Sequence, residues 1–135
     1  MFDTKIAIVV RDDLATWQKL NVTAFLTSGV LGARPELLGA DYADADGNRY
    51  APLCVQPVIV LSCDAAGLKK IHRRGLDRGV RLALYIADMF ATGHDAANRA
   101  TVEQHAAADL DIVGLALRDE KKIVDKITRG AKMHA

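Results

Sequence analysis

Four short apolar runs stand out along the chain, and polar or glycine-containing segments separate them. They span residues 5–10, 57–63, 80–86 and 110–117, and they are rich in Val, Ile and Leu. Continuous apolar runs of this length are typical of strands that are covered on both faces. The pattern therefore predicts four buried strands.

The segments between these runs have helical patterns. Helices are expected over residues 14–31, 65–79 and 120–134, and the segment 94–109 indicates a further helix that begins near His94 or Asp95. The favoured N-cap residues are Asp12 or Asp13 for the first helix, Asp64 for the second and Asp119 for the last. Residues 33–56 look irregular, although Asp46-Gly47-Asn48 is typical of a hairpin tip.

Helices that alternate with buried strands predict an α/β fold. We expect a three-layer α/β/α sandwich with a four-stranded, mixed and mostly parallel sheet. The length of 135 residues suits a single domain over residues 1–135.

Composition and charge narrow the function classes. Eighteen basic and seventeen acidic residues give a net charge of +1, which is no footprint for tight nonspecific nucleic-acid binding. No apolar run approaches the roughly 20 residues of a membrane span, and the N-terminus does not resemble a signal peptide. Cys54 and Cys63 form no CxxC pair, so we read them as reduced thiols. We expect a cytoplasmic protein with no membrane partner and no cofactor.

Charged residues follow the first and third apolar runs directly. Arg11, Asp12 and Asp13 end the first run, and Asp88 follows the third. Because ligands of open α/β sheets bind beyond the carboxyl ends of the strands, these residues are candidates for a polar site. In the alternative interpretation, Asp12 and Asp13 only cap a helix and one of them pairs with Arg11.

The segment 92–99 carries a second group of polar residues. His94, Asp95, Asn98 and Arg99 are candidates for a ligand-binding lid that faces Asp88. A metal site that joins His94 to His105 is weakly indicated, since no second histidine follows at helical spacing, and we expect no bound metal. The plainest alternative is a helix start that Asp95 caps.

Three further features have ordinary structural interpretations. The basic run at 69–78 is typical of the solvated face of a surface helix, although it has the composition of a phosphate-binding run. Trp17 is expected in the core or in an interface. Cys63 is expected to be buried, because no neighbouring histidine could activate it.

Four stretches in order resemble the peptidyl-tRNA hydrolase II fold, and more narrowly an uncharacterised bacterial branch of it that is known only as a domain of unknown function. The stretches are KIAIVVRDDL, QPVIVLSCDAAGLKKIHRRGLDRGVRLALYIAD, LDIVGLAL and IVDKITRGAK. The resemblance implies site residues at Arg11, Asp13, Gln56 and Asp88, with Asp88 as the candidate catalytic or orienting carboxylate. It also implies a homodimer.

The sequence departs from that family along its first helix. Asn21 stands where the hydrolases have a lysine, Phe25 replaces a glutamine and Ser28 replaces a histidine. Lys19 is the candidate substitute for the lysine. The segment after Asp88 is also longer than in the hydrolases. Ester hydrolysis needs an activated water and a donor for the developing oxyanion, so these departures count against it.

Three functions remain open. The favoured one is binding of a small polar or nucleotide-like ligand at the carboxyl ends of the first and third strands, with hydrolase activity in addition as an option. The candidate ligand-binding residues are Arg11, Asp13, Lys19, Asn21, Gln56, His94, Asp95, Asn98 and Arg99, and Asp88 is the candidate catalytic residue. The second is a peptidyl-tRNA hydrolase with a rearranged site, which would bind tRNA. The third is a non-catalytic interaction module.

Overall fold

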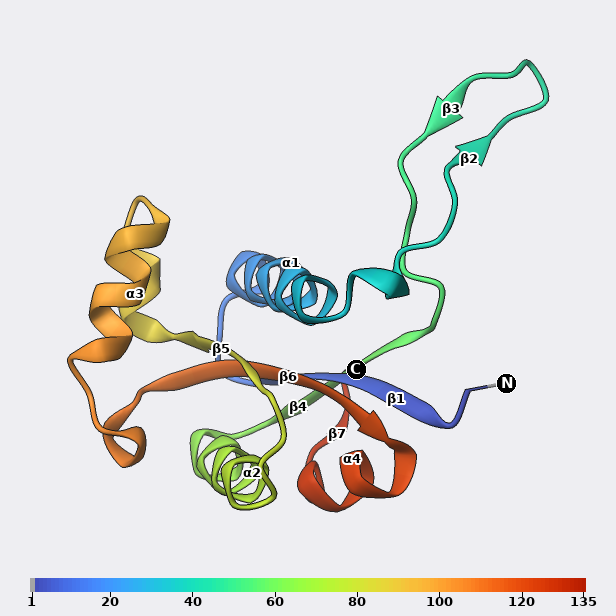
Figure 1. The fold of residues 1–135 in the computed structure, drawn as a ribbon. Helices are drawn as coiled ribbons and strands as arrows, with labels where there is room; N and C mark the ends of the chain where they lie inside the picture. Colours follow the sequence, from blue (N-terminus) through green and yellow to red (C-terminus); the bar gives the residue numbers. More distant parts are fainter. Residues whose placement is uncertain (1) are drawn as a thin grey trace.

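A mixed sheet of five strands forms the centre of the protein, as seen in a computed structural model that describes residues 2–135 (Figure 1). The strands are β1 (Thr4–Arg11), β4 (Val58–Cys63), β5 (Ala83–Ile86), β6 (Ile112–Glu120) and β7 (Lys132–Met133). Their spatial order is β5-β6-β1-β4-β7. Strands β1 and β4 pair in parallel, whereas the other three adjacent pairs are antiparallel.

Four α-helices surround this sheet. They are α1 (Thr16–Ala33), α2 (Ala65–Asp77), α3 (Asp95–Glu103) and α4 (Lys121–Ile127). Helix α1 lies on one face, α2 and α4 lie on the other, and α3 stands beyond the end of β5 (Figure 1). The described residues also form three short 3₁₀ helices, which are η1 (Pro35–Leu37), η2 (Ala87–Ala91) and η3 (Ala107–Asp109). The α/β class is therefore confirmed.

The position of β1 in the middle of the sheet explains why its residues are continuously apolar and do not alternate with polar ones. Ile6, Ile8 and Val10 belong to the core beneath α1, while Ala7 and Val9 belong to the core beneath α2 and α4. Side chains of a strand alternate between the two faces of the sheet. In a strand that is covered on both faces, every position is therefore buried and favours an apolar residue. All five side chains are buried.

The expectations of four strands and of a mostly parallel sheet are both wrong. Three of the four adjacent strand pairs are antiparallel, and the fifth strand comes from the C-terminal segment. The last helix ends at Ile127 instead of continuing toward residue 134, and Gly130 turns the chain with a φ of 99°. Lys132 and Met133 then pair with Ser62 and Leu61 of β4. This pairing satisfies backbone groups at an otherwise open sheet edge, which outweighs continuation of a short helix.

Two of the expected N-caps are also wrong. The cap of α1 is Ala15, whose backbone N–H donates to the Gln18 side chain at 3.0 Å, and neither Asp12 nor Asp13 is involved. Strand β6 runs through Asp119, so Glu120 precedes α4. Asp64 does cap α2, because its carboxylate accepts the backbone N–H of Gly67 at 2.7 Å.

A hairpin extends away from the sheet and helices (Figure 1). Its strands are β2 (Tyr42–Ala43) and β3 (Arg49–Tyr50), and Gly47 forms the turn with a φ of 88°. The sequence signal at residues 46–48 thus located the tip correctly. Among residues 2–135, every helix is too short or too polar to cross a membrane.

Candidate functional site

A cleft lies at the carboxyl end of β5, between α1, η2 and α3. It consists of two adjoining cavities of about 340 and 420 Å³. Both cavities are lined by Phe25, Tyr85, Met89, Asp95 and Asn98. Volumes of roughly 300–1,000 Å³ are typical of small-molecule sites. We call this feature the β5 cleft.

Aromatic rings form one wall of the β5 cleft. The ring centroids of Trp17 and Phe90 are 5.9 Å apart, those of Phe25 and Tyr85 are also 5.9 Å apart, and those of Tyr85 and Phe90 are 5.3 Å apart. Trp17 remains 61% exposed and Phe25 54% exposed. Trp17 was expected in the core or in an interface, and the core position is wrong, because α1 turns its other face toward the sheet.

Asparagine side chains provide hydrogen-bonding groups beside these rings. Asn21 Nδ2 donates to the hydroxyl of Tyr85 at 3.4 Å, and the hydroxyl of Thr92 donates to Asn98 Oδ1. Burial raises the pKa of Tyr85, so its hydroxyl stays protonated at neutral pH. Each amide keeps a second polar atom that can pair with a bound molecule.

The start of α3 forms the polar rim of the cleft. His94 Nδ1 accepts the backbone N–H of Ala97 at 3.2 Å, so His94 caps the helix, and Asp95 does not. Arg99 Nη2 lies 2.9 Å from the Asp95 carboxylate. The rim therefore carries one positive and one negative side chain side by side, both exposed, and has no excess of positive charge there.

Asp88 lies in η2, but it does not line the β5 cleft. Its Oδ2 is 3.2 Å from Nε2 of His105, and both side chains are about one-third exposed. The structure thus pairs Asp88 with a histidine from beyond α3 instead of with His94, Asn98 or Arg99. A carboxylate beside a histidine is an arrangement that can orient the imidazole as a proton acceptor.

Arg11 and Asp13 pair with each other at the carboxyl end of β1. Arg11 Nε donates to Asp13 Oδ1 at 2.6 Å, and Arg11 Nη1 donates to Asp111 Oδ1 at 3.0 Å. The backbone carbonyl of Asp111 also accepts the N–H of Ala87 at 2.9 Å. Arg11 and Asp88 therefore share one edge of the sheet, with Asp111 between them.

Gln56 and Lys19 lie away from the cleft. Gln56 is buried, donates to the backbone carbonyl of Thr4 at 3.0 Å and accepts from Arg118 Nε at 3.2 Å. It connects β1, β6 and the chain before β4, which is a structural role. Lys19 lies on α1 and lines neither cavity of the β5 cleft.

The structure gives little support to metal binding or to nucleophilic chemistry at Cys63. Within residues 2–135, no three His, Cys, Asp or Glu side chains lie close enough together to hold a metal ion. Partial burial and the charges of Asp64 and Asp12 raise the pKa of the Cys63 thiol to about 11, so it is a poor nucleophile at neutral pH.

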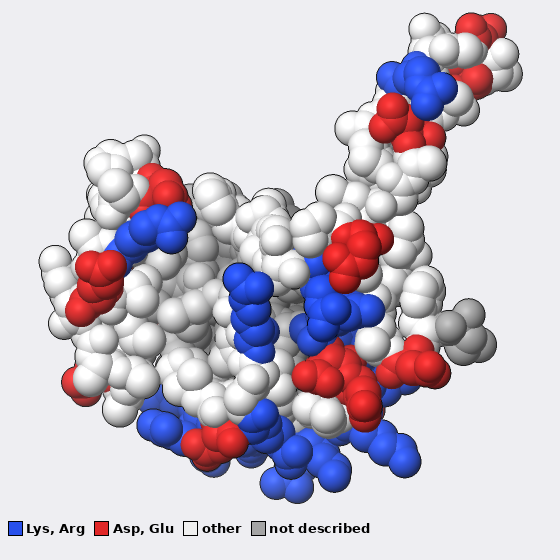
Figure 2. Space-filling view, viewed as in Figure 1, with Lys and Arg blue, Asp and Glu red and all other residues white. Residues whose placement is uncertain are grey.

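Basic side chains gather over α2 and α4 (Figure 2). Lys69, Lys70 and Arg73 are exposed on α2, as expected for a solvated helix face, and Lys121 and Lys122 are exposed on α4. The β5 cleft lies on the opposite side of the sheet, the side that α1 covers. An RNA ligand on the basic surface would therefore not lie directly over the cleft.

Sequence reasoning found part of the β5 cleft and missed the rest. Asn21, His94, Asp95, Asn98 and Arg99 are candidates that the structure brings together. The aromatic wall of Trp17, Phe25, Tyr85 and Phe90 was not predicted as a unit. A usable signal exists on α1, because Trp17, Asn21 and Phe25 are spaced by four residues and share one helix face.

Comparison with known proteins places this fold in a family. The profile described as a protein of unknown function (DUF2000) matches residues 4–135. The chain belongs to the DUF2000 family. This confirms the expectation of an uncharacterised domain family.

A solved structure shows the same architecture. It is a protein of unknown function from Agrobacterium tumefaciens strain C58. Its sequence is 56% identical over all of both chains, and the TM-score is 0.98. No curated protein matches this DUF2000 chain.

Proposed function

We propose that this DUF2000 protein binds a small polar ligand with a planar ring, such as a nucleoside, in the β5 cleft. The observation that carries the proposal is the partly exposed aromatic wall beside the asparagine amides. Exposed aromatic rings offer a stacking surface, and a base stacked on an aromatic side chain contributes about 1–3 kcal/mol. The amides of Asn21 and Asn98 supply donors and acceptors for the edge of such a ring.

The charges of the cleft favour a neutral ring over a phosphate group. Asp95 and Glu103 line the cleft, and Arg99, the one arginine among the lining residues of the described chain, forms an ion pair with Asp95. A phosphate at this rim would meet two carboxylates and only one cation, which already contacts one of them. The nucleotide-like ligand is therefore best described as a nucleoside or free base.

Trp17 makes this proposal directly testable. It is the only tryptophan in the sequence and lines the cleft, so its fluorescence reports occupancy. Titration with adenosine, guanosine, cytidine and uridine should give a saturable change for at least one of them. Adenosine monophosphate should bind no more tightly than adenosine.

A matched pair of variants tests the location. Phe25→Ala removes a wall residue and should weaken binding about tenfold. Leu20→Ala removes a similarly exposed apolar side chain that lines no described cavity, and it should leave binding unchanged. Absence of a saturable signal with every nucleoside, or equal effects of the two variants, contradicts the proposal.

Ester hydrolysis is a second candidate function, and the contact between Asp88 and His105 favours it. A histidine oriented by a carboxylate can accept a proton from water. The mixed sheet with helices on both faces supports the resemblance to peptidyl-tRNA hydrolase II, which also implies a cytoplasmic homodimer. We therefore also propose that the protein is cytoplasmic and that it forms a homodimer.

Release of labelled peptide from peptidyl-tRNA measures this second function. The wild type should show turnover that disappears in Asp88→Asn and persists in Asp109→Asn, which changes an exposed carboxylate elsewhere. Salt should weaken tRNA binding steeply if basic side chains contact phosphates. A wild-type protein without turnover excludes hydrolysis of this ester.

A further inference from the structure

The hairpin between η1 and β4 forms an arm, defined here as residues 38–55, that projects from the rest of the protein (Figure 1). Backbone hydrogen bonds fasten its base, since Gly39 N donates to Leu53 O at 3.1 Å and Val55 N donates to Leu37 O at 2.8 Å. Leu37 itself is buried in the core beneath α1. The arm is therefore anchored at one end.

The tip of the arm is ordered by Asp44. This carboxylate accepts the backbone N–H groups of Asp46 and Asn48 at 3.0 and 2.9 Å and the hydroxyl of Tyr50 at 2.6 Å. These hydrogen bonds lower the pKa of Asp44 to about 2, with Tyr50 making the largest contribution, so the side chain is negatively charged at neutral pH. Asp46 beside it has no ion-pair partner within residues 2–135.

The arm also exposes apolar surface that its own chain does not cover. Tyr42 and Tyr50 are each 53% exposed, and Leu53 is 63% exposed. A two-stranded hairpin without a further layer is at best marginally stable in water. The arm carries three aspartates and one arginine, Arg49, which lies 3.7 Å from Asp41, so its net charge is negative and Asp44 and Asp46 at the tip remain. Exposed apolar side chains on such an extended element indicate that another surface covers it.

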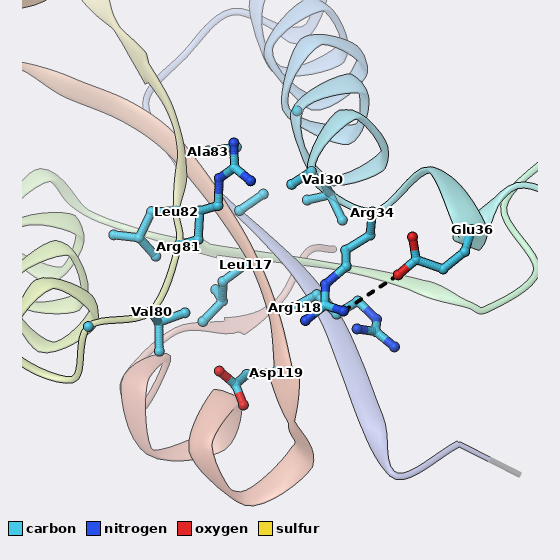
Figure 3. Close-up of a pocket in the computed structure, with 14 residues that line it drawn as sticks. Val30, Arg34, Glu36, Val80, Arg81, Leu82, Ala83, Leu117, Arg118 and Asp119 are labelled. Atoms are coloured by element: carbon cyan, nitrogen blue, oxygen red, sulfur yellow. Dashed lines mark hydrogen bonds and ion pairs between the residues drawn. The ribbon is translucent and has the colours of Figure 1, made fainter.

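A groove of matching charge lies beside the base of the arm (Figure 3). It encloses about 580 Å³, and its lining includes Arg34 from the end of α1, Arg81 before β5 and Arg118 of β6. Arg34 lies 3.5 Å from Glu36, and Arg118 donates to Gln56, whereas Arg81 has no ion-pair partner among residues 2–135. Asp119 also lines the groove, which keeps its charge moderate.

This groove contains an open stretch of sheet edge. Strand β5 pairs with β6 only as far as Ala83 and Ala116. Leu117 and Arg118 continue β6 and pair with β1 on their other side alone. An extended segment with acidic side chains fits such a place, because it can approach the exposed strand edge while its carboxylates meet the arginines.

We propose that the arm of one copy docks in the arginine groove of a second copy of this chain, so that two copies exchange arms. The acidic tip at Asp44 and Asp46 then meets Arg81 and Arg34 of the partner. Arg34 and Glu36 line the groove and immediately precede the arm, so a two-fold axis near the arm base brings each arm toward the other groove. Both contacts form together and cover the tyrosines.

Sedimentation velocity of the full chain over a range of concentrations tests the exchange. The wild type should form a dimer, and Arg81→Glu or Asp46→Arg should each raise its dissociation constant at least about tenfold, which corresponds to about 1.4 kcal/mol. The double variant Arg81→Glu with Asp46→Arg restores opposite charges and should recover much of the lost affinity. All four substituted positions in this experiment, controls included, are exposed, so folding is not at risk.

Two controls match these changes in charge. Arg78→Glu lies outside the groove, and Asp109→Arg lies in η3 beyond α3, so both should leave the dimer intact. A monomer at every concentration overturns the proposal and leaves the arm for a different partner. A dimer that responds equally to Arg81→Glu and Arg78→Glu, or that the double variant fails to recover, also overturns it.

Discussion

Helices α1 and α2 pack against opposite faces of the same sheet, yet their outer faces differ in chemistry. Helix α2 buries Leu68 and Ile71 and presents Lys69, Lys70 and Arg73 to solvent. This is the ordinary division of an amphipathic helix. Its exposed side needs no partner.

Helix α1 buries only one stripe of its apolar residues. Val22, Leu26 and Val30 face the core, while Trp17, Leu20 and Phe25 remain more than half exposed. Solvation favours polar residues at such positions, so the exposed aromatic residues support the binding surface that we propose. The difference between the helices therefore teaches that α2 serves stability and α1 serves both stability and the β5 cleft.

The largest expected effect is the loss of stability when a buried residue of α1 or α2 is truncated, compared with an exposed residue beside it. Leu26→Ala and Leu68→Ala each remove a buried side chain and should lower the free energy of unfolding by roughly 2–5 kcal/mol. Phe25→Ala should cost less than about 1 kcal/mol, and Lys69→Ala should stay within about 0.5 kcal/mol. Urea denaturation of the four variants measures the free energies.

These four variants also show how the comparison could fail. If Phe25→Ala destabilises the protein as much as Leu26→Ala, the outer face of α1 is part of the fold and not a binding surface. If Lys69→Ala has a large cost, the basic face of α2 is not simply solvated.

A smaller effect is expected from His72 of α2, which should make the stability of the protein depend on pH. Burial, with the nearby charge of Arg73, lowers the pKa of His72 below its ordinary value of 6.5. As the pH falls below 6.5, the unfolded chain takes up a proton that the folded protein resists, so stability falls in acid. His72→Gln should flatten this dependence.

Denaturation between pH 5 and 7 measures this effect against a second histidine variant. His134→Gln is the matched control, because it removes a histidine of the C-terminal segment whose Nδ1 lies 2.9 Å from the backbone oxygen of Ala135. The loss of stability that His72 causes in acid should persist in this variant. An unchanged slope in His72→Gln would show that another group causes the loss of stability in acid.

Much of the fold was predictable because it depends on local patterns. The apolar runs of β1 and β4, the Asp64 cap of α2 and the turn at Gly47 follow from burial and from local hydrogen bonds. Strand β7 was not predictable in this way. Its two residues become a strand only because the edge of β4 is available for pairing.

In the candidate site, too, features formed by neighbouring residues were predictable and contacts between distant segments were not. The polar residues at 94–99 were recognised because they cluster in the sequence. The contact between Asp88 and His105 joins residues separated by all of α3, and the aromatic wall joins Trp17 to Phe90. Arg11 was a reasonable ligand candidate, and its pairing with Asp13 was an alternative that the sequence already offered. Its second partner, Asp111, is 100 residues away in the sequence and is shown only by the structure.

The sequence by itself determined the α/β class, the buried strands, the hairpin tip and the polar start of α3. Each of these depends on residues close together in the chain, where burial periodicity, capping and turn preferences act directly. Only the tertiary structure decided which face of α1 is covered, which carboxylates are neutralised and which aromatic rings meet at the end of β5. Those outcomes depend on contacts between distant segments, and such contacts exist only once the sheet has ordered its strands.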